Sequence, residues 1–135
     1  MNRFLDSSVL VESCLKGSRF FAAADRLVND AEACTSAHGL AECFATLSGD
    51  PRLKIRPADA AQMVEDLAEA LEVRVATLED YRTVISKASP KGVRGGMVYD
   101  ALHAETARKA GCKEIHTLNV SHFKHVAPDL TVLGL

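Results

Sequence analysis

The fold of this chain is decided by the stretch Gly95-Gly96-Met97-Val98-Tyr99-Asp100-Ala101-Leu102-His103-Ala104, which continues to Gly111 and then to Thr117-Leu118-Asn119. From Met97 to Ala110, apolar and small residues recur at steps of three and four, a spacing that predicts a helix. Gly111 follows it at the position where a glycine commonly ends a helix. Asp100 lies near the start of this mostly apolar helix, where burying a carboxylate is costly without a partner. The rest of the sequence must supply that partner.

Length and composition restrict the class of protein. A chain of 135 residues fits a single domain, residues 1–135, with its own hydrophobic core. The net charge of −2 gives no overall basic character, so binding to nucleic acid would need a local basic patch. No apolar run is long enough to cross a bilayer, and Asp6 follows the first residue too closely for a signal peptide. We therefore expect a cytoplasmic protein without membrane contact.

The four cysteines are scattered and form no C-x-x-C pair. Cys34, His38 and Cys43 could be part of a zinc cluster, but no fourth ligand has a suitable spacing. Reduced and largely buried thiols are the expected state of these residues.

Short strand candidates alternate with helical patterns along the whole chain. Strands are expected at Arg3–Leu5, Ala33–Thr35, Val73–Ala76, Lys113–Thr117 and Leu130–Leu133. Helices are expected at Val9–Leu15, Arg19–Asp30, His38–Gly49, Pro57–Ala70, Leu78–Ala88 and Met97–Ala110, with a short helical or irregular turn at Val120–Val126. Apolar residues expected on the core faces of two of these helices are Leu40, Phe44 and Leu47, and Tyr81, Val84 and Ile85. The alternation predicts an α/β fold with a parallel sheet.

Polar residues near the ends of the first and fourth strands could meet in such a fold. Asp6 ends the first strand and Asn119 follows the fourth, and these strand ends can lie side by side where the strand order reverses. Glu42 and Asp100 lie near the starts of helices that could flank the same crevice. Each has a plainer interpretation, since Asp6 could serve only as a helix cap and Glu42 could be an exposed residue of an amphipathic helix.

Three converging carboxylates would repel one another unless a cation neutralises them. Oxygen ligands of this kind suit Mg²⁺ or Mn²⁺ rather than Zn²⁺. A metal so placed supports hydrolysis of a phosphodiester, because it activates a bound water and offsets the charge that builds up on the phosphate. Lys91 and Arg94 precede the Asp100 helix and are candidates to hold a nucleic-acid backbone, as are Lys87, Arg52 and Lys54. A solvated surface is the alternative for each of these basic residues.

Four segments, taken in order, resemble the PIN-domain nucleases and in particular the VapC-type toxins of bacterial type II toxin–antitoxin pairs. They are Phe4–Val11 with Asp6, His38–Leu47 with Glu42, Tyr99–Ala104 with Asp100 and the following Ala107–Gly111, and Thr117–Phe123 with Asn119. Each motif is short, but four in order at the spacing of the family span nearly the whole chain.

The resemblance implies a PIN-like three-layer fold with a central parallel sheet of about five strands and helices on both faces. It also implies an endoribonuclease that depends on Mg²⁺ or Mn²⁺, forms a homodimer, and is neutralised by a cognate antitoxin with which it assembles on operator DNA. Asp6 and Asp100 would be the leading metal ligands, and Glu42 would complete the acidic cluster. Ser7 and Thr117 would support them through hydrogen bonds.

Two positions depart from the family pattern. Asn119 stands where many members carry an acid, which puts a second metal site in question, although its amide oxygen could still bind a metal or orient a water. His122 stands where some members have an acid before the Phe. It could contact a phosphate or act as a general acid, or it could be an exposed histidine beside Phe123. His103, one turn after Asp100, could hydrogen-bond Asp100 or serve as a structural histidine.

Two rival functions are alternatives to the nuclease. The neutral Asn119 is compatible with a PIN-like module that binds RNA or protein without cleavage. An aspartyl-phosphate phosphatase would normally carry a second Asp two residues after its nucleophile, whereas Ser8 stands two residues after Asp6. The nuclease is the interpretation that uses most of the residues.

Overall fold

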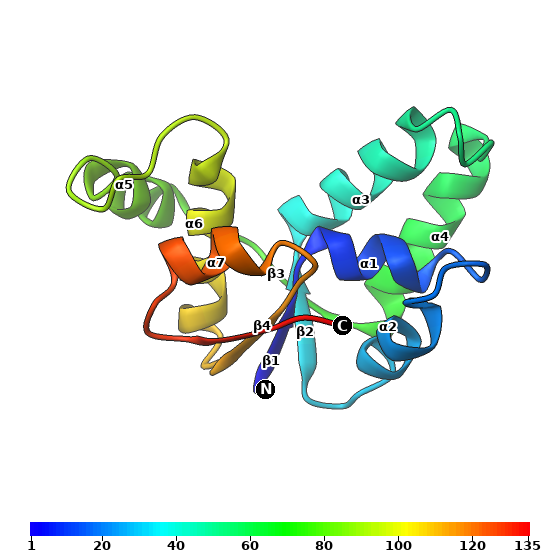
Figure 1. Ribbon diagram of the computed structural model, residues 1–135, viewed down its shortest axis with the longest axis horizontal. Helices are drawn as coiled ribbons and strands as arrows, with labels where there is room; N and C mark the ends of the chain where they lie inside the picture. Colours follow the sequence, from blue (N-terminus) through cyan, green and yellow to red (C-terminus); the bar gives the residue numbers. More distant parts are fainter.

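The computed structural model describes all 135 residues of the chain (Figure 1). Its five strands are β1 (Arg3–Leu5), β2 (Ala33–Ser36), β3 (Glu72–Arg74), β4 (Glu114–His116) and β5 (Thr131–Leu133). They form one sheet in the order β3-β2-β1-β4-β5, and every neighbouring pair is parallel. The predicted α/β fold with a parallel sheet of about five strands is confirmed.

Helices cover both faces of this sheet, which gives three layers. They are α1 (Ser7–Ser13), α2 (Phe21–Val28), α3 (Ala37–Gly49), α4 (Pro57–Ala70), α5 (Leu78–Ser86), α6 (Met97–Lys109) and α7 (Val120–Val126). Figure 1 shows α1 to α4 on one side of the sheet and α5 to α7 on the other.

Two hydrophobic cores lie on opposite faces of the sheet. Leu5 of β1 belongs to the core formed with α1 to α4, whereas its neighbour Phe4 belongs to the core formed with α6 and α7. Ala33 and Cys34 of β2 divide between the two cores in the same way. Successive side chains of a strand point to opposite faces, so the central strands contribute alternate residues to each layer.

Strand register places the two segments of the candidate site side by side. In the pairing of β1 with β4, Phe4 lies opposite Ile115 and Leu5 lies opposite His116. Asp6 and Thr117 therefore leave the sheet at the same level, at its carboxyl edge. Because β1 has β2 on one side and β4 on the other, this edge is the point where the strand order reverses, where open α/β sheets bind ligands.

Some details of the predicted helices differ. The first helix begins at Ser7 rather than Val9, because the Asp6 carboxylate itself accepts hydrogen bonds from the first free backbone N–H groups. The other expected elements are present, several with shifted or shorter ends. Gly111 has φ +81° directly after α6, as expected of a glycine that ends a helix.

The predicted core faces of α3 and α5 are partly wrong. Phe44 is exposed, and the buried stripe of α3 is instead Gly39, Cys43 and Leu47. Residue 44 follows Cys43 by one position, so its side chain turns away from the core by about 100°. In α5, Val84 is buried as expected, but Tyr81 and Ile85 are exposed.

The cysteines are free thiols, and Cys34, Cys43 and Cys112 are buried, as predicted. Cys34 Sγ lies 3.3 Å from Cys112 Sγ in one core, whereas Cys43 belongs to the other core. Cys34 and Cys43 are thus on different faces of the sheet, so they form no zinc cluster with His38. None of the helices combines the length and the apolar character that a bilayer span requires.

Candidate active site

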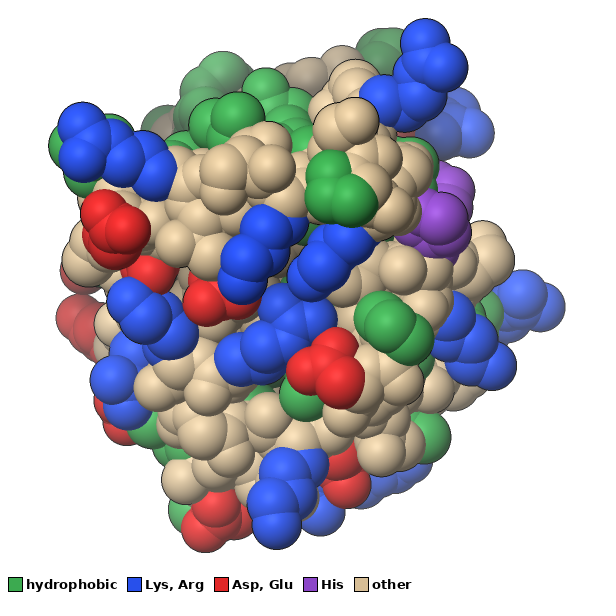
Figure 2. Space-filling model, turned by 90° about the vertical axis from the view of Figure 1, so that its left-hand side faces the viewer, with side chains coloured by type: hydrophobic (Ala, Val, Ile, Leu, Met, Phe, Trp, Pro, Cys, Tyr) green, Lys and Arg blue, Asp and Glu red, His purple; other side chains and the backbone are tan.

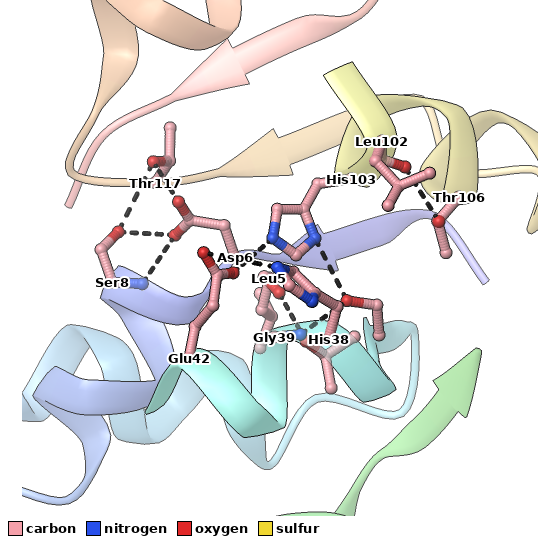
Figure 3. A network of polar contacts seen from close by, with 12 residues as sticks. Leu5, Asp6, Ser8, His38, Gly39, Glu42, Leu102, His103, Thr106 and Thr117 are labelled. Atoms are coloured by element: carbon pink, nitrogen blue, oxygen red, sulfur yellow. Dashed lines mark hydrogen bonds and ion pairs between the residues drawn. The ribbon is translucent and has the colours of Figure 1, made fainter. Parts of the chain in front are cut away.

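Asp6 is the centre of a hydrogen-bond network at the carboxyl edge of the sheet (Figure 3). It is the N-cap of α1, and its side chain is buried. Its Oδ1 accepts hydrogen bonds from the Ser8 backbone N–H at 3.0 Å and from the Ser8 hydroxyl at 2.5 Å. Its Oδ2 accepts a hydrogen bond from the Thr117 hydroxyl at 2.8 Å. Both carboxylate oxygens are thus held by groups from opposite ends of the chain.

Ser8 joins the start of α1 to the segment that follows β4. Its hydroxyl oxygen accepts a hydrogen bond from the Leu118 N–H at 2.9 Å while its proton is given to Asp6. Thr117 makes the matching pair of contacts, since its hydroxyl oxygen accepts from the Asn119 N–H at 2.8 Å. The two hydroxyl oxygens are 3.5 Å apart. These bonds fix the position of Asp6 relative to both strands.

The family resemblance predicted Ser7 and Thr117 as groups that support the acidic cluster, and the serine that hydrogen-bonds Asp6 is Ser8. The signal was present, because an N-cap carboxylate bonds groups two and three residues ahead, and Ser8 is two residues ahead of Asp6. The Ser7 hydroxyl interacts with Glu42 instead. It lowers the pKa of that carboxyl, but by less than His103 and His38 do. Thr117 lies where the sequence predicted a supporting group.

The carboxylates of Asp6 and Asp100 are both placed where ionisation is unfavourable. Burial raises the pKa of Asp6, and the hydrogen bonds from Ser8 and Thr117 offset this only in part. Burial also raises the pKa of Asp100, and the neighbouring negative charges of Asp6 and Glu42 raise it further. The structure therefore brings the three predicted acids into one electrostatically coupled region.

Glu42 differs from the other two acids because histidines surround it. Burial would raise its pKa, but the hydrogen bond and charge of His103, together with the charge of His38, bring the pKa below its ordinary value. His103 Nε2 lies 2.6 Å from Glu42 Oε1, and His103 Nδ1 lies 3.1 Å from the Ser36 hydroxyl oxygen. The suggested hydrogen bond between His103 and Asp100 is absent, because both ring nitrogens of His103 have other partners.

The segment after β4 places its polar residues at the outer side of the region. Asn119 is exposed and its side chain does not cap α7, so only its backbone N–H joins the Asp6 network. His122 is also largely exposed, and its Nδ1 lies 3.7 Å from Asp100 Oδ2. His122 is thus the side chain of α7 that lies against an acid of the site.

Two sets of groups could hold a metal ion. Asp6 and Asp100 offer carboxylate oxygens, and burial raises the pKa of each. One ligand atom from each of His38, Glu42 and His103 also lies within 4.8 Å of the others. Asp6 and Asp100 do not belong to a three-residue group as tight as this one.

Basic side chains gather on the side of the molecule that carries α5, α6 and α7, with acidic ones between them (Figure 2). Lys87, Lys91 and Arg108 line a shallow pocket on these helices. Arg108 is paired with Glu105 and Asp129. Lys91 and Arg94 lie in the loop between α5 and α6, are exposed, and form no ion pair, so their charges are available to a ligand.

A comparison with models of known protein families matches residues 3–128 to the PIN domain. The chain belongs to the PIN-domain family. The match includes Asp6, Glu42, Asp100 and Asn119, and it extends over all helices and the first four strands. A search of curated proteins finds no match.

Solved structures with the same fold include several VapC and VapBC proteins. DNA-bound VapBC from Salmonella typhimurium has a TM-score of 0.74 and 18% sequence identity, over 99% of this chain and 98% of that one. VapBC2 from Rickettsia felis, bound to a DNA fragment from its promoter, has a TM-score of 0.71 and 19% identity, over 100% and 99%. VapC20 from Mycobacterium tuberculosis, a toxin that cleaves the sarcin–ricin loop, has a TM-score of 0.68 and 19% identity, over 84% and 87%. At these identities the likeness establishes the fold.

Proposed function

We propose that this PIN-domain protein is a metal-dependent endoribonuclease and the toxin of a toxin–antitoxin pair. The family match and the shared fold with VapC structures support this function. The observation that carries the proposal is the coupling of Asp6 and Asp100. Each carboxylate has a pKa raised by burial, and the charge of Asp6 raises the pKa of Asp100 further. Carboxylates in this arrangement are stabilised by a bound cation.

Mg²⁺ or Mn²⁺ fits this set of donors, because both ions prefer oxygen ligands. Asp6 and Asp100 would bind the ion, and Glu42 would complete the acidic cluster. When bound, the metal would supply an activated water and would offset negative charge on the phosphate. A phosphodiester of RNA is the substrate class that such a site suits.

The chain's own groups would position the reactants. Ser8 and Thr117 hold both oxygens of Asp6 in place, which keeps the carboxylate oriented toward the substrate. His122, beside Asp100 and exposed, would contact the phosphate or give a proton to the leaving oxygen. The amide of Asn119 would orient a water or bind the metal without adding charge. Lys91 and Arg94 would hold the RNA backbone.

The proposed partners follow from the family and from the related assemblies. The structures from Salmonella typhimurium and Rickettsia felis are VapBC complexes with DNA. For this chain we accordingly propose a cognate antitoxin, a homodimer, and an assembly of toxin and antitoxin on operator DNA.

Cleavage of cellular RNA by the purified, antitoxin-free chain tests the proposal. We expect cleavage that EDTA abolishes and that added Mg²⁺ or Mn²⁺ restores. Asp100→Asn should fold, as judged by circular dichroism, and should lose cleavage by about 10²-fold or more, because it removes a carboxylate ligand of the metal that would activate the water. Glu65→Gln, at an exposed position of α4, is the control and should cleave at the wild-type rate.

A folded Asp100→Asn variant that still cleaves at the wild-type rate would remove Asp100 from the mechanism. Cleavage that persists in EDTA would exclude the metal-dependent reaction.

The second candidate function is a PIN-like module that binds RNA or protein without cutting it. The exposed, uncharged Asn119 in place of an acid favours this alternative. It would be supported if the pure chain retained RNA in a binding assay but cleaved no cellular RNA with either metal.

A further inference from the structure

A group of two histidines and one glutamate lies beside the carboxylates of Asp6 and Asp100. His103 Nε2 is 2.6 Å from Glu42 Oε1, and His38 Nε2 is 3.9 Å from Glu42 Oε2. The imidazole rings of His38 and His103 are 5.5 Å apart between centroids. Figure 3 shows the side chains of Glu42 and His38 extending from α3 toward His103 of α6. The nuclease proposal gives no role to either histidine.

We propose that His38, Glu42 and His103 form a binding site for a borderline transition-metal ion, for which Zn²⁺ is the suitable probe. Two imidazole nitrogens and one carboxylate oxygen are a ligand set that zinc takes in proteins, with a fourth position left to water or a ligand. Imidazole also distinguishes Zn²⁺ from Mg²⁺, which prefers oxygen. This site shares Glu42 with the acidic cluster proposed for Mg²⁺, and its other two ligands are histidines that the Mg²⁺ cluster does not use.

The distances in the group suit such an ion. Ligand atoms at about 2.1 Å from a tetrahedral centre are separated from one another by about 3.4 Å. In the group, His103 Nε2 lies 2.6 Å from Glu42 Oε1 and His38 Nε2 lies 3.9 Å from Glu42 Oε2, so each histidine is next to a different carboxylate oxygen. Binding of an ion to one carboxylate oxygen would require the Glu42 carboxylate to rotate so that a single oxygen faces both histidines. The ion would replace the present hydrogen bond between His103 Nε2 and Glu42 Oε1.

The surroundings of His103 hold its ring in the required orientation. The side chain is buried, and its ring lies 5.8 Å from that of Phe4 and 6.5 Å from that of Phe123 between centroids. The Nδ1 atom lies 3.1 Å from the hydroxyl oxygen of Ser36, which in turn accepts a hydrogen bond from the Gly39 N–H at 2.9 Å. A hydrogen bond of this kind to the other ring nitrogen is what orients metal-binding histidines in proteins.

The opposite side of the group is open to an arriving ion. The side chains of His38 and Glu42 are 36% and 33% exposed, so the site has a route to solvent. His38 is nevertheless steadied, because its ring stacks on that of Tyr99 at 5.3 Å between centroids, with 19° between the planes. Glu42 presents both carboxylate oxygens to the histidines, one to each. The group therefore combines one fixed ligand with two accessible ones.

Titration of the EDTA-treated full chain with Zn²⁺ tests this site without RNA or Mg²⁺. Isothermal titration calorimetry should show one Zn²⁺ bound per chain. Co²⁺ in place of Zn²⁺ should give visible absorption typical of tetrahedral coordination. His38→Gln and His103→Gln should each weaken Zn²⁺ binding by about tenfold or more. His125→Gln is the matched control, since the ring of His125 bonds only the Lys91 carbonyl oxygen, and its Zn²⁺ binding should equal that of the wild type.

Three results would overturn the proposal. The first is a wild-type chain that takes up no Zn²⁺. The second is unchanged Zn²⁺ affinity in His38→Gln. Because His38 is partly exposed, this variant still tests the site if His103→Gln fails to fold. The third is loss of binding in Asp100→Asn together with retention in His38→Gln, which would place the ion among the carboxylates. Because these measurements involve no cleavage, a failure here and a failure of the nuclease proposal are separate results.

Discussion

The Thr117 hydroxyl donates a 2.8 Å hydrogen bond to Asp6 Oδ2 across 111 residues of sequence. This bond exists because β1 and β4 are parallel neighbours in matched register, so that the residues directly following them meet at the carboxyl edge of the sheet. It fixes the carboxylate on which the proposed metal site depends. The bond is therefore both a structural link and a part of the site.

Replacing Thr117 with Val tests the strength of this link. The Thr117→Val side chain keeps the shape of the buried threonine but leaves Asp6 Oδ2 and the Asn119 N–H without their partner. We expect the free energy of unfolding in urea to fall by about 1–3 kcal/mol. Thr131→Val, at an exposed position of β5, should change it by no more than about 0.5 kcal/mol. Similar small changes in both variants would mean that the bond contributes little.

The two serines at the start of α1 form a matched pair of variants. Ser8→Ala removes a donor to Asp6 and an acceptor for the Leu118 N–H. We expect it to reduce RNA cleavage by about 10–100-fold, the usual effect of losing a group that orients a metal ligand. Ser7→Ala, which lacks a bond to Asp6, should have a smaller effect in the same cleavage assay. The reverse order would restore Ser7 as the supporting residue.

The buried charge of Asp6 should reduce stability when no metal is bound. Its folded-state pKa lies above the ordinary value of 3.8, so its contribution to stability falls as pH rises from about 3.8 through the folded-state pKa. Asp6→Asn removes the charge and keeps a good N-cap. At pH 7 without divalent ions, the variant should therefore have a higher Tm than the wild type. The difference should narrow as the pH approaches 3.8.

Binding of Mg²⁺ should offset the buried negative charge of Asp6 and raise the stability of the wild type. At ten times its Kd it would stabilise the wild type by about 1.4 kcal/mol, and it should leave the Tm of Asp6→Asn unchanged. Differential scanning fluorimetry with and without Mg²⁺ measures both effects, with Glu65→Gln expected to respond as the wild type does. If Asp6→Asn is less stable than the wild type in the absence of metal, the Asp6 carboxylate stabilises the fold without a bound cation.

The loop between α5 and α6 should contribute charge to RNA binding. Arg94 is exposed and has no acidic partner, so Arg94→Ala should weaken binding of single-stranded RNA. It should also reduce the slope of log K against log salt by about 0.7, the value for one lost phosphate contact. Arg26→Ala, at an exposed position of α2, should leave the slope unchanged. Equal slopes for both variants would place the RNA elsewhere on the surface.

Much of the architecture could be predicted because it depends on periodic patterns. The alternation of strands and helices was sufficient for a parallel sheet, and a parallel sheet places the residues after β1 and β4 at one edge. The meeting of Asp6 with Thr117 follows from that topology alone. The approach of Asp100 and Glu42 required only that α6 and α3 begin at the same edge, since each acid lies within the first two turns of its helix.

What could not be predicted depends on the rotation of each helix about its own axis. Phe44 and Cys43 are neighbours in α3 and both are apolar. The rotation of α3 about its axis decides that Cys43 is buried and Phe44 is exposed. The contacts of His103 with Glu42 and Ser36 on neighbouring elements, rather than with Asp100 of its own helix, also have no periodic signal. The orientation of Asn119 likewise depends on how the chain leaves β4, which has no periodic signal. These features are fixed by packing between distant segments.

The link between Asp6 and Thr117 also has a consequence for the order of synthesis. A ribosome adds Asp6 and Ser8 long before their partners Thr117 and Leu118, which come only after α6 and β4 have been made. A growing chain that has not reached β4 therefore holds an acid without the hydroxyl that orients it. Any activity of this centre would begin only after β4 and the two residues that follow it have been made, and a product truncated before β4 would be inert.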